Sequence, residues 1–281
     1  MVDYAGRVPD DHPTRPEAAD VKRGNRMSKP ARRCIFCGAK GVTKEHFFPR
    51  WCAPLFVDTI TDKRIELSFT QAGPRQLVGT PSFLTRPGSV LTKKIRVVCG
   101  NCNNTWMSAI EAAAQPVITA LATGINITLN TDHKAKLAQW AALKVMVCEH
   151  SIIDDSITPP SQREEFRVNR DVIPQGFQIW VGRCGLDRWR GGLYRSAATY
   201  CLPGHVPNDT SRKNTQTVTI GLGDLFLFVL TRTTEPLFDL DLKPSQLSRL
   251  WPLDQQELNW RNVERLTLKQ ADDVARTLAG C

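Results

Sequence analysis

Two short stretches decide the fold: Cys34-Ile35-Phe36-Cys37-Gly38 and Val98-Cys99-Gly100-Asn101-Cys102-Asn103. Each Cys-x-x-Cys pair allows one turn to present two sulfur atoms to a single ion, and two such turns complete the four-thiolate tetrahedral shell of structural zinc. The chain has nine cysteines, an odd number that argues against a framework of disulfides. The sequence therefore predicts one structural zinc ion held by Cys34, Cys37, Cys99 and Cys102.

The segment that carries both cysteine pairs also carries the positive charge of the chain. Among 281 residues, 37 are Lys or Arg and 28 are Asp or Glu, which gives a formal charge of +9. Residues 29–107 hold thirteen basic and four acidic side chains, whereas residues 1–28 and 108–281 are each neutral. Lys and Arg displace counterions from nucleic acid, so a basic module of this kind is typical of proteins that bind phosphates. From charge alone, the alternative is a solvated basic surface.

The N-terminal segment and the apolar runs bear on cellular location. Residues 1–30 are rich in proline and charge and lack periodicity, so they predict a flexible tail, in which Met27 is an alternative start to Met1. The first 20 residues have no apolar core, unlike a secretory signal. No uncharged apolar run approaches the roughly 18 residues of a membrane helix. We expect a cytoplasmic protein that does not span a membrane.

The pattern of apolar residues predicts an α+β protein with two domains. Strand-like runs at 64–70 and 93–98 lie within the cysteine-bearing segment, and a helix is expected from 105 up to Pro116. A change in composition and charge near Gly124 predicts a domain boundary that divides residues 31–125 from 126–281. The second unit should contain a buried helix at 131–149 and strands at 177–181 and 193–202. A hairpin turning at Gly223-Asp224 and a final helix should follow, the helix opening on the capping box Thr267/Gln270.

Between the cysteine pairs lies Thr43-Lys44-Glu45-His46-Phe47-Phe48-Pro49-Arg50-Trp51. The succession Cys-x-x-Cys, Glu-His-x-x-Pro and Cys-x-x-Cys-Asn resembles the zinc-bound HNH endonucleases, also called His-Me finger or ββα-metal nucleases. The resemblance covers residues 31–112. It implies a zinc-stapled treble-clef or ββα-metal nuclease module, followed here by a second α+β domain with no motif of its own.

The resemblance also implies roles for single residues. His46 is expected to be the general base, Glu45 and Asn103 to hold a catalytic Mg²⁺ or Mn²⁺, and Arg50 is a candidate phosphate clamp. An imidazole titrates near neutral pH, and carboxylate and amide oxygens suit a hard cation. The expected reaction is one-metal hydrolysis of DNA that leaves 5′-phosphate and 3′-hydroxyl ends.

Plainer interpretations of the same residues stay open. Glu45-His46 is also an ordinary polar pair for a strand end, and Asn103 and Asn104 are both favourable helix caps. Trp51 and Trp106 are expected in the core. The remaining histidines, His12, His133, His150 and His205, are expected to be structural or in the tail. The remaining cysteines are expected to be buried or incidental thiols: Cys52, Cys148, Cys184, Cys201 and Cys281.

Two departures from the HNH pattern favour a second interpretation. Many HNH proteins carry another Asn, which orients the base, about five residues before the second cysteine pair; here that residue is Lys94. The stretch from His46 to Cys99 is also long, which predicts an inserted hairpin or loop whose basic residues follow a nucleic-acid backbone: Arg75, Arg86, Lys93, Lys94 and Arg96. The alternative function is a non-catalytic zinc module that binds nucleic acid or a partner protein. For the neutral residues 126–281 we expect a role in partner recognition, dimerisation or target choice.

Overall fold

The computed structural model describes residues 32–56, 66–72, 77–83, 93–151, 156–184, 192–201, 213–233 and 246–276. Backbone contacts divide the chain into a unit of residues 1–31 and a unit of residues 32–281. The predicted tail at 1–30 lies outside the described residues, which begin at 32. Within the described part, no helix is both long enough and apolar enough to cross a membrane.

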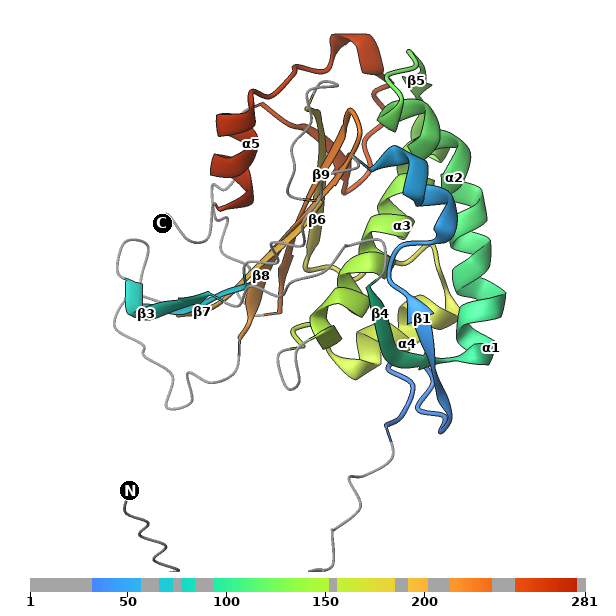
Figure 1. Ribbon diagram of the computed structural model, residues 1–281, viewed down its shortest axis with the longest axis vertical. Helices are drawn as coiled ribbons and strands as arrows, with labels where there is room; N and C mark the ends of the chain where they lie inside the picture. Colours follow the sequence, from blue (N-terminus) through green and yellow to red (C-terminus); the bar gives the residue numbers. More distant parts are fainter. Residues whose placement is uncertain are drawn as a thin grey trace, which may run out of the picture. The chain divides into compact units, whose positions relative to one another are not determined.

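A seven-stranded sheet organises the larger unit (Figure 1). Its order is β10-β6-β9-β8-β7-β2-β3, and every neighbouring pair is antiparallel except β2 and β7. The strands span Glu66–Ala72 (β2), Leu77–Phe83 (β3), Phe177–Arg183 (β6), Leu193–Cys201 (β7), Thr215–Leu222 (β8), Leu225–Arg232 (β9) and Ser248–Trp251 (β10). The predicted strands beginning near 177 and 193 and the predicted hairpin are confirmed.

The turn between β8 and β9 requires a glycine. Gly223 adopts a φ of +54°, and a Cβ on it would lie 2.2 Å from the carbonyl oxygen of Ala122. The amide of Asp224 donates a 2.8 Å hydrogen bond to that same oxygen. Because only glycine tolerates both the positive φ and this close approach, the hairpin tip is fixed against the end of helix α2 (Ser108–Ala122).

Helices cover the two faces of the sheet. Figure 1 shows α2 and α3 on one side and α5 on the other. The longer helices span Ser108–Ala122 (α2), Thr131–Cys148 (α3), Pro160–Val168 (α4) and Leu268–Ala275 (α5). The shorter helical turns are Arg50–Leu55 (η1), Gly100–Cys102 (α1), Asn103–Met107 (η3), Glu149–Ser151 (η4) and Trp260–Asn262 (η5). A small pair joins β5 (Thr128–Leu129) to β11 (Leu258–Asn259).

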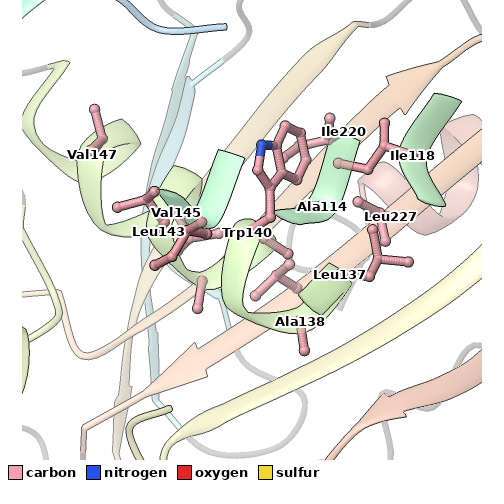
Figure 2. Close-up of a cluster of buried hydrophobic side chains, with 14 of the residues drawn as sticks. Ala114, Ile118, Leu137, Ala138, Trp140, Leu143, Val145, Val147, Ile220 and Leu227 are labelled. Atoms are coloured by element: carbon pink, nitrogen blue, oxygen red, sulfur yellow. The ribbon is translucent and has the colours of Figure 1, made fainter. Parts of the chain in front are cut away.

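Helix α3 lies at the centre of the main core, as predicted from its apolar faces. Asn130 caps its start by accepting a 2.9 Å hydrogen bond from the amide of His133. Every residue from Trp140 to Cys148 is buried. Figure 2 shows Trp140 packed among side chains of α2 and of the sheet, including Ile118, Ile220 and Leu227. Burial of a helix on all sides places it inside the fold and not on its surface.

The prediction that the helix after the second cysteine pair ends at Pro116 is wrong. Helix α2 continues through Pro116 to Ala122. Pro116 and Ala112, whose carbonyl loses its helical donor to the proline, are both exposed, so water can satisfy that carbonyl. The buried positions Ile110, Ala114, Val117, Ile118 and Leu121 continue past the proline and anchor the helix on the core.

A capped helix, α5, covers the second face of the sheet. Thr267 and Gln270 form the predicted capping box, and Ala271, Val274 and Ala275 pack on a separate apolar cluster with Trp180 and Phe228. Leu278 and Gly280, also assigned to this helix from the sequence, lie outside the described residues.

The cysteine-bearing segment contributes strands to the seven-stranded sheet and side chains to the main core. Strands β2 and β3 come from the long stretch between His46 and Cys99, where an inserted hairpin was predicted, yet they join the sheet beside β7. One buried cluster also extends from Cys34 and Phe48 to Leu227. The division expected between residues 125 and 126 therefore does not coincide with a break in either the sheet or the core.

Candidate metal centre

Two turns bring the four predicted zinc ligands together. In the first turn, the amide of Gly38 donates to the carbonyl of Cys34 at 2.9 Å, and Gly38 adopts a φ of +69°. The second turn begins where β4 (Lys94–Cys99) runs into α1, and the sulfur of Cys99 accepts a 3.5 Å hydrogen bond from the amide of Cys102. The amide of Ile35 also donates to the carbonyl of Val97 at 2.9 Å, which ties the first turn to β4.

The sulfur positions fit a tetrahedral metal ion. The Sγ atoms of Cys34, Cys37, Cys99 and Cys102 all lie within 4.8 Å of one another. The Sγ atoms of Cys37 and Cys99 are 3.6 Å apart. With zinc–sulfur bonds of about 2.3 Å, a tetrahedral site separates neighbouring sulfurs by about 3.8 Å. The four cysteines thus form a cluster suited to a metal such as zinc.

The thiols differ in how readily they ionise. Burial disfavours the Cys34 thiolate, but hydrogen bonds from the backbone amides of Cys37, Cys99 and Phe36 outweigh it and lower the pKa to about 7. Burial raises the pKa of the Cys37 and Cys102 thiols. Because metal ligation requires thiolates, a bound cation would release protons from these two thiols.

Strand β1 (Val42–His46) carries the predicted catalytic pair and is antiparallel to β4. Glu45 pairs with Ile95 and His46 pairs with Lys94, and the register shifts between Thr43 and Glu45. In a regular strand Glu45 and His46 would point to opposite faces, but the irregularity beside Glu45 disrupts the ladder and increases the local twist there. The position where many HNH proteins carry a base-orienting Asn is directly across from His46, and Lys94 occupies it.

The inner face of β1 borders the start of the helix. An added Cβ on Gly100 would lie 3.7 Å from the methyl group of Thr43 and 3.9 Å from the amide nitrogen of Asn104. Thr43 and Asn104 therefore both border Gly100, at the point where β4 leads into the helix.

The predicted cation ligands Glu45 and Asn103 each offer a side-chain oxygen. Asn103 follows Cys102 directly, and its Nδ2 donates to Oδ1 of Asn104 at 3.2 Å, a contact that does not engage its own amide oxygen. The side chain of Glu45 makes no hydrogen bond or ion pair with any other residue in the described ranges. Carboxylate and amide oxygens are ligand types that Mg²⁺ accepts together with water. Arg50, the fourth predicted site residue, is exposed at the start of η1.

A buried lysine holds the end of β1, and sequence reasoning did not identify its role. Nζ of Lys144 in α3 donates to the carbonyl of Phe47 at 2.8 Å and pairs with the carboxylate of Glu111 in α2. Only 3% of its side chain is exposed. The available signal was a single charge within the apolar run of α3. Lys144 fixes the residue that follows Glu45-His46 to both helices.

The aromatic residues and the spare cysteines behave as predicted where they are described. Trp106 is buried and meets Phe36 edge-to-face with ring centroids 4.9 Å apart, and Trp51 packs partly buried on the same core. Cys52, Cys148 and Cys184 are buried and take part in no disulfide. Cys281 lies outside the described residues, as does the side chain of Cys201.

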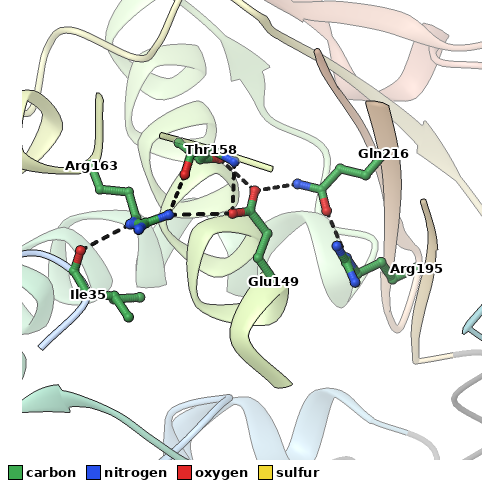
Figure 3. A network of polar contacts seen from close by, with 6 residues as sticks. All are labelled: Ile35, Glu149, Thr158, Arg163, Arg195 and Gln216. Atoms are coloured by element: carbon green, nitrogen blue, oxygen red, sulfur yellow. Dashed lines mark hydrogen bonds and ion pairs between the residues drawn. The ribbon is translucent and has the colours of Figure 1, made fainter. Parts of the chain in front are cut away.

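A buried polar network connects the first cysteine turn to the sheet (Figure 3). Nε of Arg163 in α4 donates to the carbonyl of Ile35 at 3.0 Å, and its other end donates to the carbonyl of Thr158 and lies 4.0 Å from the Glu149 carboxylate. Glu149 accepts hydrogen bonds from Thr158 and from Gln216 of β8. Gln216 in turn accepts a 2.7 Å hydrogen bond from Arg195 of β7. Each of these side chains is buried, so the network is a fixed connection.

Comparisons of the chain with protein-family models, with curated proteins and with solved structures each returned no match. Function has to be inferred from the residues and geometry of this chain.

Proposed function

We propose that the chain is a metal-dependent endonuclease of the HNH type that hydrolyses phosphodiester bonds in DNA. One observation carries the proposal: β1, which bears Glu45-His46, pairs with β4, and β4 leads through Cys99 and Cys102 directly to Asn103 at the start of a helix. This strand–strand–helix order, closed by the four-cysteine cluster, agrees with what the HNH resemblance implies.

The proposed roles follow from the chemistry of each side chain. His46 accepts the proton of the attacking water, and Arg50 holds a phosphate oxygen of the substrate. A divalent cation held by Glu45 and Asn103 would stabilise the charge that develops on the phosphoryl and leaving oxygens. Cleavage of the bond between the phosphorus and the 3′ oxygen, which leaves as the hydroxyl, gives a 5′-phosphate and a 3′-hydroxyl. The four cysteines hold zinc in a structural role.

The decisive experiment compares His46→Ala with the wild-type protein in nicking of supercoiled plasmid DNA, zinc-replete and with added Mg²⁺ or Mn²⁺. Loss of a general base lowers the rate by roughly 10² to 10⁴-fold. Zinc content and circular dichroism should be unchanged, because His46 is outside the cysteine cluster and the buried core. Undiminished cleavage by the variant would rule out the assignment.

His133→Ala is the matched control. His133 is partly exposed in the first turn of α3, and its ring contacts the carbonyl of Thr128 at 3.0 Å. The His133→Ala variant should cleave plasmid DNA at the wild-type rate. Equal losses in both variants would point to a general effect of removing an imidazole and not to a base at position 46.

A second candidate function has its own supporting observation. Lys94 is the cross-strand partner of His46, so a cation stands where an orienting amide is expected. A zinc module that binds nucleic acid or a protein without cutting would tolerate this arrangement. This second function predicts salt-sensitive DNA binding with no cleavage under any divalent cation, and binding that is unchanged in Glu45→Ala.

A cytoplasmic location, and partner recognition or dimerisation through residues 126–281, stay predictions.

A further inference from the structure

A recess on the β1–β4 strand pair is lined by basic side chains. It has a volume of about 620 Å³, and its lining residues are Arg32, Gly41, Val42, Lys44, Lys94 and Arg96. Four of the six carry a positive charge, and no acidic side chain lines it.

The alternation of the two strands produces this charge pattern. On β4, Lys94 and Arg96 are exposed while Ile95 and Val97 are buried, so both basic side chains project from the outer face of the strand. On β1, Val42 and Lys44 line the same recess. His46 pairs directly with Lys94, whose side chain lines the recess, which places His46 on this face as well.

The positive charge in the recess is not neutralised by the described part of the chain. Arg32, Lys44, Lys94 and Arg96 form no hydrogen bond or ion pair with another side chain in the described ranges. The buried cations of α3 differ, since Lys134 is paired with Asp254 and Lys144 with Glu111. Gathered cations of one sign raise the local potential and attract a polyanion.

The spacing of the cations favours a polymer over a single small anion. Lys94 and Arg96 are two residues apart on a strand, about 6.6 Å at their Cα atoms, and Lys44 lies on the adjacent strand about 4.8 Å away. Arg32 comes from the turn before Cys34. A nucleic-acid strand presents one phosphate per roughly 3.4 Å of axis, so several phosphates in series fall within reach of these side chains.

We propose that this recess binds the sugar–phosphate backbone of a nucleic-acid strand through Arg32, Lys44, Lys94 and Arg96, and that the strand passes along the face of β1 that carries His46. The inference deepens the proposed nuclease function and rests on it for the position of the strand relative to the base. Phosphate contacts of this kind position a substrate without reading its sequence.

The test measures binding separately from cutting. The zinc-loaded full chain is titrated into a fluorescein-labelled DNA duplex without Mg²⁺ or Mn²⁺, from about 50 to about 300 mM KCl. Each phosphate contact contributes about 0.9 to the slope of log K against log salt, so Lys94→Ala/Arg96→Ala should lower the slope by about 1.8. Affinity at the lowest salt should fall by 10-fold or more, and Lys44→Glu should weaken binding further.

Arg261→Ala/Lys269→Ala is the control of equal charge change. Both residues are exposed and lie far along the chain in the neutral C-terminal part. The control should keep the wild-type slope. An unchanged slope in Lys94→Ala/Arg96→Ala, or an equal drop in the control, overturns the proposal. Displacement of the duplex by inorganic phosphate, at a salt concentration where matched chloride does not displace it, would also overturn it in favour of a small-anion site.

Failure of the recess and failure of the nuclease proposal give different results. If the recess variants lose salt-dependent binding but no form of the protein cuts DNA, the recess stands and the catalytic assignment falls. If the protein cuts with dependence on His46 while the recess variants keep the wild-type slope, the catalytic assignment stands and the recess falls.

Discussion

The β1–β4 strand pair and the seven-stranded sheet are built from the same kind of backbone ladder, yet they are stabilised differently. No residue of β1 is buried, whereas every residue of β8 and β9 is. An isolated two-stranded ladder is marginal in water, so β1–β4 depends on the cysteine cluster and on the helix that follows it. Strand β9 places apolar side chains in both buried clusters, and β8 in one of them. The pair held by cysteines keeps its outer face available for a ligand, and β8 and β9 do not.

Removing a metal ligand should have the largest effect, because it should destabilise the β1–β4 pair and leave the seven-stranded sheet intact. Cys102→Ser should abolish stoichiometric zinc binding and speed amide exchange in β1, β4 and the first cysteine turn by roughly a thousandfold or more. Structural zinc contributes about 10 kcal/mol or more to small domains. Exchange in β8 and β9 should change little, as measured by hydrogen exchange with mass spectrometry. Cys52→Ala, at a buried thiol outside the cluster, should retain zinc. Equal loss of protection in β8 would show that the two regions unfold together.

Substitution of Trp140 tests whether the β1–β4 region and the seven-stranded sheet share one apolar core. It is fully buried, packs near Phe48 with ring centroids 6.3 Å apart, and contacts the apolar side chains shown in Figure 2. Trp140→Ala should lower the free energy of unfolding by about 3–5 kcal/mol in denaturant titrations. Val168→Ala, at a side chain that is 66% exposed, should change it by less than about 0.5 kcal/mol. A small effect of the Trp140 change would contradict a shared core.

Arg163 tests the polar connection between the regions. Arg163→Ala removes the donor to Ile35 and leaves Glu149 with one cation fewer, so a loss of about 3 kcal/mol in unfolding free energy is expected. Release of zinc to a chelating dye should become faster, because the turn of Cys34 and Cys37 loses an anchor. Arg163→Lys should restore only part of the stability, since an ammonium lacks the planar fork that reaches both partners. Unaltered zinc release in Arg163→Ala would show that the network does not support the cluster.

The smallest expected effect concerns pH. Burial, assisted by the charges of Arg163 and Arg195, lowers the pKa of His150 from 6.5 to about 4. The folded protein therefore keeps this imidazole neutral where the unfolded chain protonates it. The stability contribution is present above pH 6.5 and is lost as pH falls toward 4, which amounts to about 2 kcal/mol between about pH 7 and pH 5. In denaturant titrations across this range, His150→Gln should show a pH dependence flatter by that amount. Parallel curves for the two proteins would contradict it.

Local patterns predicted much of the fold. The hairpin at Gly223, the α3 helix and the capping box at Thr267 each depend on neighbouring residues, so the local sequence predicts all three. The continuation of α2 past Pro116 was missed because local propensity at a proline is weaker than the burial of the helix face on either side of it. The place of β2 and β3 was also missed, since pairing with β7 joins residues more than 100 positions apart and leaves no local trace.

The sequence by itself determined the cluster of four cysteines, the concentration of positive charge in residues 29–107 and the Glu45-His46 motif, because spacing and side-chain chemistry are properties of the chain. Only the tertiary structure decided that Lys94 faces His46, that Lys144 and Arg163 anchor the motif and the cysteine turn to distant helices, and that four cations line one recess. These relations depend on strand register and on packing between segments far apart in sequence. Register and long-range packing are set by the global minimum of the whole chain and not by any local pattern.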